Sequence, residues 1–350
     1  MPTTFAHRLI AWYEQNCRDL PWRHTTDPYV IWLSEIILQQ TRVEQGMDYY
    51  HRFLKRFPTV FDLAKANSDE VMRLWQGLGY YSRARNLHAA AQQIASNGSF
   101  PTTYEGIIQL KGVGPYTAAA IASFAYGLPH AVVDGNVYRV LSRYFDVPIP
   151  IDTTQGKHHF QQLAQSLLPP QRAALFNQAM MDFGATCCTP LSPRCAECPL
   201  SEGCLAYAQR IVAQRPVKQK RLQVRTRHFV YIVVVSPTHL LLQQRPAGDI
   251  WQGLYQPPLA EFAAPPAAEE VLSLELVSTL LSQPQATFTA LAQGIQHRLT
   301  HRLLSTDAYL LSVPSLSVAP EGYLLVERAR IDDYGMPQLV VKLLEKALSR

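Results

Sequence analysis

The chain has 350 residues, of which 47% are apolar, and this composition supports two globular domains rather than a disordered chain or a short peptide. Residues 1–225 contain 23 Lys and Arg against 16 Asp and Glu, whereas residues 226–350 contain 9 against 11. The basic surplus of the first part fits a nucleic-acid partner, although ordinary enzymes also carry surpluses of this size.

The N-terminal stretch carries charges among its apolar residues, unlike a signal peptide, and the chain has no uncharged apolar run long enough for a transmembrane helix. We therefore predict a cytoplasmic protein that makes no membrane contact. Neither half of the chain shows an apolar stripe left over for self-association, so we expect a monomer.

The sequence pattern predicts two domains of different class. Residues 1–212 place apolar side chains at helical spacing, such as Phe5 and Leu9, and Pro or Gly residues separate the segments, which predicts an all-α region. Residues 213–227 have no apolar period and concentrate positive charge, which predicts a basic linker. Residues 228–350 alternate short aliphatic runs with helical stretches, which predicts an α+β domain.

A glycine-rich hairpin is predicted within residues 105–127, between an apolar helix and a helix of small residues. Gly112 and Gly114 permit a positive φ and a close backbone approach, and Pro115 suits the first turn of the second helix. Such a helix-hairpin-helix presents Gly112, Val113 and Gly114 to a DNA phosphate without reading sequence. An ordinary helical turn with a glycine cap is the alternative.

Four of the six cysteines lie within residues 188–204 in the pattern C-x6-C-x2-C-x5-C. Thiolates at this spacing can enclose one compact centre, either tetrahedral zinc or a [4Fe–4S] cluster. One C-x2-C with longer arms resembles the iron–sulfur loop of the endonuclease III family, so we predict a [4Fe–4S] cluster and keep zinc as the alternative. The predicted ligands are Cys188, Cys195, Cys198 and Cys204.

The hairpin and the cysteines together resemble the helix-hairpin-helix DNA glycosylase superfamily. Its members carry an aspartate about twenty residues after the hairpin, and Asp134 has that position here, where it also reads as a helix N-cap. Bifunctional members carry a lysine nucleophile two residues after the second glycine, but this chain has Tyr116 there. The resemblance therefore implies a glycosylase without strand-cleaving imine chemistry.

Three segments resemble the adenine-specific MutY branch of this superfamily, namely VIWLSEIILQQTRV (30–43), GLGYYSRARNL (77–87) and FNQAMMDFGA (176–185). This resemblance implies excision of adenine mispaired with 8-oxoguanine or guanine in double-stranded DNA, after the base is flipped out of the helix. It also implies that Glu35 protonates adenine and that Asp134 stabilises the cationic sugar, a division of work known from paired carboxylates in glycosidases.

Glu35 is predicted to lie among apolar neighbours on its helix, which would raise its pKa towards that of a general acid. The structural alternative is that Glu35 pairs with Arg42 or with another residue of its helix. The same resemblance implies that Tyr116 and Asn136 support Asp134 and the reacting sugar. The residues implied to enter the space left by the flipped base are Gln40 and one of Tyr80 and Tyr81, and those implied to line the adenine pocket are Trp22, Arg23 and Gln178.

Residues 228–350 resemble the MutT/Nudix-like domain that MutY proteins carry at their C-terminus. The Glu-rich box that binds metal in Nudix hydrolases is missing, which predicts a recognition module instead of a nucleotide hydrolase. In the family, a Phe-Ser-His loop probes 8-oxoguanine, and the matching residues here are Leu299, Thr300 and His301. A plain surface hairpin is the alternative for this segment.

Three other functions compete with adenine excision. The first is an endonuclease III-like glycosylase/lyase acting on oxidised pyrimidines, against which Tyr116 argues. The second is a Nudix-type hydrolase of oxidised nucleotides, against which the missing box argues. The third is a non-catalytic iron–sulfur DNA-binding protein, which would not need Asp134 for its activity.

Overall fold

The structure is a computed structural model that describes residues 2–219 and 224–349. These residues form two compact units, one built from residues 2–65 and 86–219 and the other from residues 66–85 and 224–349. The segment 66–85 lies inside the region predicted to be the helical domain, but it packs with the C-terminal residues.

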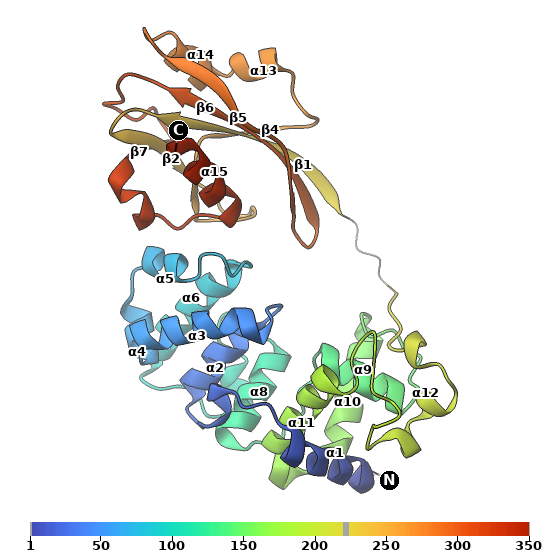
Figure 1. Cartoon of the computed structure of the whole chain (residues 1–350). Helices are drawn as coiled ribbons and strands as arrows, with labels where there is room; N and C mark the ends of the chain where they lie inside the picture. The colour runs from blue at the N-terminus through green and yellow to red at the C-terminus, as the bar shows by residue number, and fades with distance from the viewer. Residues whose placement is uncertain (1, 220–223, 350) are drawn as a thin grey trace. The chain divides into compact units, whose positions relative to one another are not determined.

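The first unit is helical (Figure 1). Its α-helices are α1 (Pro2–Asn16), α2 (Pro28–Leu38), α3 (Val43–Arg56), α4 (Val60–Lys65), most of α6 (Ser82–Asn97), α7 (Tyr104–Ile107), α8 (Pro115–Tyr126), α9 (Gly135–Tyr144), α10 (Thr154–Leu167), α11 (Ala173–Thr186) and α12 (Leu205–Ala208). Short 3-10 turns join them at η1 (Pro21–Arg23), η2 (Pro170–Arg172), η3 (Ser201–Gly203) and η4 (Val212–Gln214). None of the described helices combines the length and apolarity needed to cross a bilayer.

One core of this unit joins its two ends. Phe5 and Leu9 of α1 are buried against Val140 of α9 and Phe176 of α11, so the helical stripe predicted for α1 does face a core. Because α11 packs against both α1 and α9, this core connects distant parts of the chain and holds the start of α9 and the middle of α11 in fixed positions. Both segments contribute to the site described below.

The hairpin forms between α7 and α8 as predicted, with Pro115 in the first turn of α8. Gly112 has φ 76°, and a Cβ atom there would lie 2.5 Å from Cβ of Asn86, so this position requires glycine. Gly114 has φ −98°, so only Gly112 uses the positive φ that both glycines permit. The space that a Cβ atom of residue 114 would occupy is open, with no atom outside the chain neighbours of Gly114 within 4 Å.

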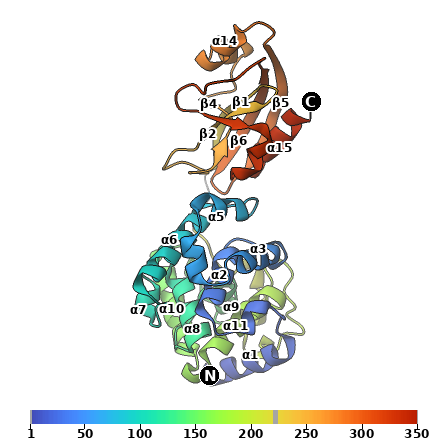
Figure 2. The same cartoon turned by 90° about the vertical axis from the view of Figure 1, so that its left-hand side faces the viewer.

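The second unit contains α5 (Ser68–Leu74) and a sheet covered on both faces (Figures 1 and 2). Its strands are β1 (Arg225–Val235), β2 (His239–Gln244), β3 (Tyr255–Gln256), β4 (Leu259–Phe262), β5 (Thr287–Arg298), β6 (Arg302–Ser312) and β7 (Leu324–Glu327). The path is β3-β2-β1-β6-β5, with β4 paired to β1 and β7 to β2, and β1 runs parallel to β6. The helical elements are α13 (Ala268–Leu272), α14 (Glu275–Leu281), α15 (Gln338–Leu348) and η5 (Arg328–Asp333).

Alternate residues of β1 build two separate cores. Phe229 and Tyr231 face the side covered by α15, whereas Val230 and Ile232 face the side covered by α13 and α14. This alternation is the period of a β-strand buried on both faces, and it explains the continuous apolar run of β1.

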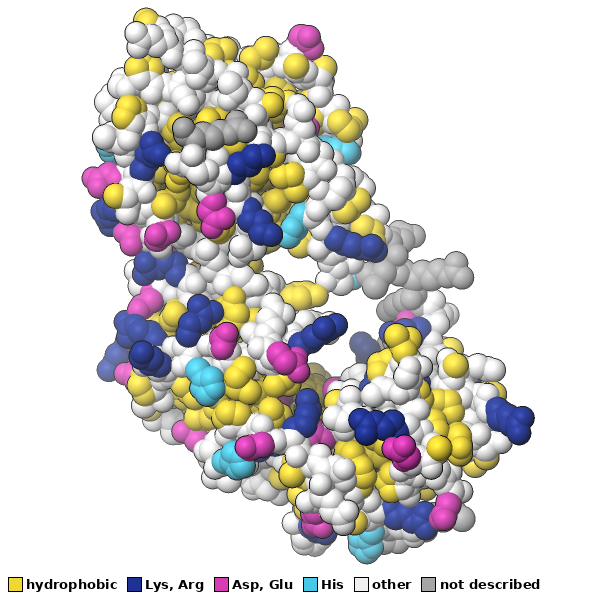
Figure 3. Space-filling model, viewed as in Figure 1, with side chains coloured by type: hydrophobic (Ala, Val, Ile, Leu, Met, Phe, Trp, Pro, Cys, Tyr) yellow, Lys and Arg dark blue, Asp and Glu magenta, His cyan; other side chains and the backbone are white. Residues whose placement is uncertain are grey.

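Strand β1 begins at Arg225, so the prediction of a linker over 213–227 is wrong at its C-terminal end. Residues 220–223 of that linker lie outside the described residues. Its first residues pair with β6, starting with Arg225 opposite Arg302, and Arg227 also has ion-pair partners, Asp249 at 2.5 Å and Glu261. On the face shown in Figure 3, basic side chains are scattered among apolar and acidic ones and do not form a single positive area.

Candidate active site

Helix α2 places Glu35 at the base of a pocket in the first unit. Asp27 caps the helix by accepting a hydrogen bond from the Tyr29 backbone N–H, and Pro28 occupies its first turn. Trp32 and Ile36, on either side of Glu35 in the sequence, are buried, and the Glu35 residue is itself only 7% exposed. The Tyr116 hydroxyl donates a hydrogen bond of 2.8 Å to Glu35 Oε2.

The pKa of Glu35 is raised to about 7, mainly by burial and to a smaller extent by the negative charge of Asp134. The hydrogen bond from Tyr116 and the positive charge of Arg23 act in the opposite direction but are too weak to restore the ordinary value. A carboxyl group with a pKa near 7 can hold a proton at neutral pH and release it to a base, as a general acid does. The predicted raised pKa thus has a structural cause.

Asp134 is the N-cap of α9, as predicted. Its Oδ1 accepts hydrogen bonds from the backbone N–H groups of Asn136 at 2.9 Å and Val137 at 2.8 Å, and its Oδ2 accepts one from Asn136 Nδ2 at 2.7 Å. Burial raises the pKa of Asp134, while these hydrogen bonds lower it and leave a net rise. The helix N-terminus therefore offsets part of the desolvation, although not all of it.

Arg139 connects this aspartate cap to the cysteine loop. Its Nη2 donates to Asn136 Oδ1 at 2.8 Å and to the Gly184 carbonyl at 2.6 Å, and its Nε donates to the Cys188 carbonyl at 2.7 Å. Helix α11 can approach this closely because residue 184 is glycine: a Cβ atom there would lie 2.5 Å from Cβ of Asn136.

The pocket brings together most of the residues predicted for catalysis and adenine binding. Its walls include Trp22, Arg23, Glu35, Gln40, Tyr116, Asp134 and Asn136. Gln178 is not among the lining residues; its Oε1 accepts a hydrogen bond from the Tyr13 hydroxyl at 2.8 Å. Helix α11 contributes Met181 and Ala185 to the lining instead.

Sequence reasoning missed two functional candidates in this wall, Arg18 and Asp182. Arg18 lines the pocket, and Asp182 is a fully buried acid of α11 that binds Arg18 and Arg23. The available signal was the single acidic residue within the apolar segment FNQAMMDFGA, because a lone charge on a buried face needs a partner.

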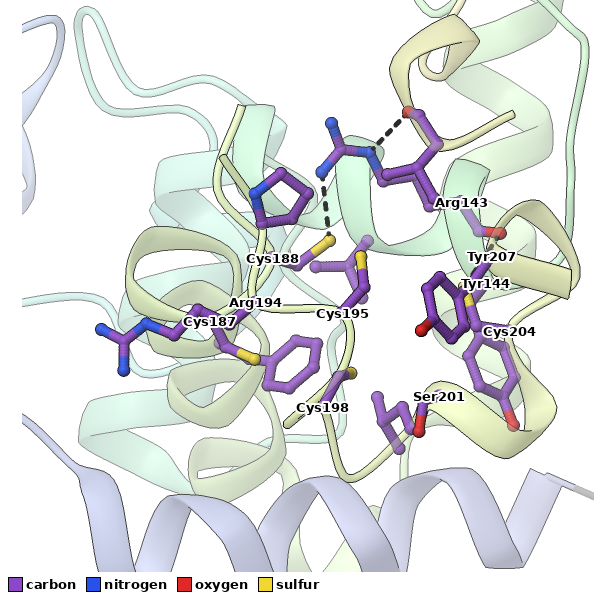
Figure 4. Close-up of a pocket in the computed structure, with 15 residues that line it drawn as sticks. Arg143, Tyr144, Cys187, Cys188, Arg194, Cys195, Cys198, Ser201, Cys204 and Tyr207 are labelled. Atoms are coloured by element: carbon purple, nitrogen blue, oxygen red, sulfur yellow. Dashed lines mark hydrogen bonds between the residues drawn. The ribbon is translucent and has the colours of Figure 1, made fainter. Parts of the chain in front are cut away.

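The cysteine loop surrounds a second pocket in the same unit (Figure 4). Its walls include all four predicted ligands and, in addition, Cys187. The buried guanidinium of Arg143 donates to Cys188 Sγ at 3.4 Å and to the Thr189 carbonyl at 2.7 Å, so a positive charge faces the sulfur atoms.

The chemistry of this pocket fits a cluster. Among residues 2–219 and 224–349, no three His, Cys, Asp or Glu side chains converge tightly enough to hold one metal ion. The four thiols instead surround a common space with apolar walls and one cation, and an anionic iron–sulfur cube bound by four thiolates needs such surroundings. Cys188, Cys195, Cys198 and Cys204 would hold it.

The residues predicted to touch DNA have different surroundings. Gln40 is exposed and has φ 55°, a strained backbone conformation of the kind that occurs at functional sites. In the hairpin, Val113 buries its side chain and its N–H donates to the Leu110 carbonyl at 3.0 Å, so Gly112 and Gly114 carry the more accessible backbone.

Tyr80 and Tyr81 belong to the second unit and have opposite environments. Tyr80 is 47% exposed with φ 49°, whereas Tyr81 is buried and donates to the Met336 carbonyl at 3.2 Å. Leu299, Thr300 and His301 form the turn between β5 and β6, and within this unit Thr300 Oγ1 lies 2.6 Å from the Tyr80 hydroxyl. Tyr80 and the turn residues line one pocket.

Comparison with known proteins connects these sites to described families. Residues 33–170 match the family described as HhH-GPD superfamily base excision DNA repair protein. Residues 188–204 match the iron-sulfur binding domain of endonuclease III, and residues 230–346 match the NUDIX domain. The four cysteines therefore form a [4Fe–4S] site, and the C-terminal unit contains a Nudix domain.

Relatives named adenine DNA glycosylase extend this similarity. The Mus musculus protein is 46% identical over 216 residues, which cover 59% of this chain. The Schizosaccharomyces pombe protein is 30% identical over 415 residues, covering 98% of this chain and 89% of that protein. This chain belongs to the adenine DNA glycosylase family.

The family is the MutY type, in which a helix-hairpin-helix domain with an iron–sulfur loop precedes a Nudix domain. The chain spans 42% of the length of the mouse adenine DNA glycosylase. Among solved structures, a thermostable thymine-DNA glycosylase is 32% identical with a TM-score of 0.56, and it covers 59% of this chain. The endonuclease III-like and non-catalytic alternatives are not favoured by these matches.

Proposed function

We propose that this protein is a monofunctional adenine DNA glycosylase that excises adenine opposite 8-oxoguanine or guanine in duplex DNA. The observation that carries the proposal is the pairing of Glu35 with Tyr116 in the pocket that also contains Asp134. A buried proton donor and a second carboxyl group in one pocket can act on the two sides of a glycosidic bond.

Glu35 supplies the acid. Adenine is a poor leaving group as an anion, and protonation at its N7 lets it leave as a neutral base. Because burial raises the pKa of Glu35 to about 7, the carboxyl group is partly protonated under neutral conditions. The Tyr116 hydrogen bond fixes the orientation of the carboxyl group, so that its other oxygen can face the base.

Asp134 stabilises the positive charge that develops on the deoxyribose as the bond breaks. Asn136 holds Oδ2 of Asp134, and the backbone of α9 holds Oδ1, so the carboxylate is oriented before substrate arrives. A water molecule then adds to C1′ of the sugar cation and gives up a proton, so the product is an abasic site. Tyr116 offers a phenol and no amine at the position of the lyase nucleophile, so imine formation and strand cleavage are not expected.

Adenine in a duplex is out of reach, so it must leave the base stack before it enters the pocket. Gln40 and Tyr80 are the exposed side chains suited to occupy the vacated space. The backbone at Gly112 and Gly114 holds a phosphate, and Trp22 and Arg23 enclose the base. Leu299, Thr300 and His301 read the opposite base, with Thr300 supplying the hydroxyl.

A bound [4Fe–4S] cluster crosslinks the thiolates of its four cysteines and gives loop 188–204 one fixed shape. The glycosidic reaction itself needs none of its redox chemistry. We expect the protein to act as a monomer in the bacterial cytoplasm, at the nucleoid.

The proposal is tested by single-turnover cleavage of end-labelled duplexes that contain A opposite 8-oxoguanine, A opposite G, A opposite T, or T opposite G. Each reaction is developed with and without alkali. We expect alkali-dependent breakage at adenine in the first two duplexes, no cleavage of A opposite T, and no adduct when borohydride is added.

Two outcomes would contradict the proposal. Breakage without alkali, with a borohydride-trapped adduct, would indicate a glycosylase/lyase. Preferred removal of thymine from the fourth duplex would instead indicate the activity for which the thermostable thymine-DNA glycosylase is named.

A further inference from the structure

Asp182 lies in the middle of α11 and is fully buried. It accepts hydrogen bonds from two arginines. Arg18 donates to it from its backbone N–H at 3.0 Å, from Nε at 2.9 Å and from Nη2 at 2.5 Å. Arg23 donates from Nη1 at 2.7 Å and from Nη2 at 2.6 Å. Both carboxylate oxygens are therefore occupied by charged donors.

The two arginines reach different depths. The side chain of Arg18 is 34% exposed, whereas that of Arg23 is 10% exposed. Arg23 is held further by a hydrogen bond of 2.8 Å to the Arg18 carbonyl, and its guanidinium carbon lies 5.6 Å from the centre of the Tyr13 ring. Arg23 thus has one well-defined orientation in the wall of the pocket.

Arg23 acts on Glu35 through its charge. Its positive charge opposes the rise in the pKa of Glu35, and the other groups that face Glu35 are Tyr116 of α8 and Asp134 at the start of α9. Arg18, Arg42 and Glu44 also line this pocket. Asp182 does not line this pocket, but it binds Arg18 and Arg23, which do.

We propose that Asp182 is a positioning residue for adenine excision, which holds Arg18 and Arg23 as a rigid and charge-compensated wall facing Glu35. This inference rests on the proposed function of Glu35 as the acid. Two arginines without a counter-ion would present two positive charges to the pocket, and they would favour the ionised form of Glu35. The negative charge of Asp182 compensates one of the two arginine charges. Because Asp182 already holds both side chains, they lose little conformational entropy when substrate binds.

This role differs from that of an ordinary buried ion pair. A buried pair that only stabilises the fold would affect the folded fraction at every pH to a similar degree. A charge-compensating residue instead changes the pH at which Glu35 loses its proton, and that change can be reversed by removing one of the arginine charges. The two roles therefore predict different results for a compensating double variant.

The experiment measures single-turnover excision of adenine opposite 8-oxoguanine between pH 5 and pH 9 for the whole cluster-loaded protein. We compare wild type with Asp182→Asn, with the conservative Asp182→Glu, and with the double variant Asp182→Asn/Arg18→Gln. Asp182→Asn keeps the side-chain shape but removes the charge. Iron absorbance and circular dichroism establish that each variant is folded and loaded.

For Asp182→Asn we expect the midpoint of the alkaline limb to fall by about one pH unit and the rate near pH 7.5 to fall about tenfold. Asp182→Glu and the double variant should both return the midpoint towards the wild-type value. A midpoint unchanged in Asp182→Asn, or one that the Arg18→Gln change does not restore, overturns the proposal. If Asp182→Asn fails to fold, Arg18→Gln is measured alone. It removes one positive charge from the wall and should raise the midpoint, whereas Asp182→Glu should leave it near the wild-type value. A midpoint that is unchanged or lower in Arg18→Gln overturns the proposal.

A second readout does not require turnover. The infrared carbonyl band of the protonated Glu35 carboxyl group, assigned by its loss in Glu35→Gln, should disappear at lower pH in Asp182→Asn than in wild type. Wild-type protein that excises no adenine would overturn the proposed function, whereas the infrared band would still decide whether Asp182 controls the proton on Glu35.

Discussion

The guanidinium Nε of Arg139 donates a hydrogen bond of 2.7 Å to the backbone carbonyl of Cys188, the first of the four cluster ligands. The same side chain holds Asn136, which in turn holds Asp134. A continuous set of hydrogen bonds therefore joins the cysteine loop to the carboxylate that we assign to the sugar. The loop and the aspartate cap should consequently depend on each other.

Replacing Arg139 with Gln tests this dependence. The shorter neutral side chain cannot bridge Asn136, Gly184 and Cys188, so we expect both iron retention and single-turnover excision to fall, each by about 10- to 100-fold. Arg8→Gln is a matched control, since Arg8 pairs with Glu202 on the surface at 2.8 Å and should change neither property. Full excision with a reduced iron content would mean that the two sites are independent.

Glu35→Gln should abolish the acid while keeping the shape of the side chain. We expect excision to fall by about 100-fold or more, with binding to an A:8-oxoguanine duplex retained. Because the pKa of Glu35 is about 7, wild-type excision should also decline as the pH rises above neutrality. An unchanged rate in Glu35→Gln would remove Glu35 as the acid.

The same residue makes a prediction about stability. The pKa of Glu35 is raised in the folded state, so its contribution to stability is fully present below pH 4.5 and is lost as the pH rises through 7. Above neutral pH, Glu35→Gln should therefore exceed wild type in unfolding free energy by a difference on the order of 3 kcal/mol. Urea unfolding at pH 4.5 and pH 8 measures this difference, which should be small at the lower pH.

Local signals in the sequence predicted part of the site well. Asp134 was recognisable as an N-cap because the cap hydrogen bonds reach only two and three residues along the chain. The turn at Leu299–His301 and the hairpin before α8 likewise depend on neighbouring residues. The helical stripe of Phe5 and Leu9 correctly indicated a buried face, since helical periodicity is also local.

Long-range partners were not predictable in the same way. Asp182 binds Arg23 across 159 residues, and no period or spacing connects the two positions. The packing of α1 against α11 brings Gln178 close to Tyr13, whose hydroxyl donates a hydrogen bond to it. A resemblance to a family does not predict this contact. The early start of β1 follows from its pairing with β6 and from the ion pairs of Arg227 with Asp249 and Glu261. These partners are distant in the sequence, so the charged segment alone resembles a linker.

Gly112 and Gly114 should respond differently to alanine. At Gly112, φ is 76° and a Cβ atom would contact Asn86, so Gly112→Ala should lower the free energy of unfolding by about 1 kcal/mol or more and weaken DNA binding with it. At Gly114, φ is ordinary and no atom outside its chain neighbours lies within 4 Å of the Cβ position, so the free protein should keep its stability. The added methyl group would instead occupy the space that a phosphate needs.

We therefore expect Gly114→Ala to weaken duplex binding about tenfold with an unchanged Tm. Fluorescence anisotropy with a duplex that contains an abasic-site analogue measures the binding, and thermal unfolding in the absence of DNA measures the stability. Equal losses of stability in both variants would show that the two glycines share one structural role and that the hairpin does not approach a phosphate at Gly114.

Cys198→Ser tests the assignment of the cluster ligands. Removing one thiolate should eliminate the iron–sulfur absorbance and lower the Tm of the first unit, because the cluster is expected to hold loop 188–204 against α9. Arg143 would then still donate to the Thr189 carbonyl at 2.7 Å, but it would face a smaller negative charge in the pocket.

Cys17→Ser is the matched control, since Cys17 is exposed and lies outside the pocket. Iron content measured by a colorimetric chelator should fall only in Cys198→Ser; equal iron in the two variants would mean that Cys187, which lines the same pocket, replaces Cys198 as a ligand.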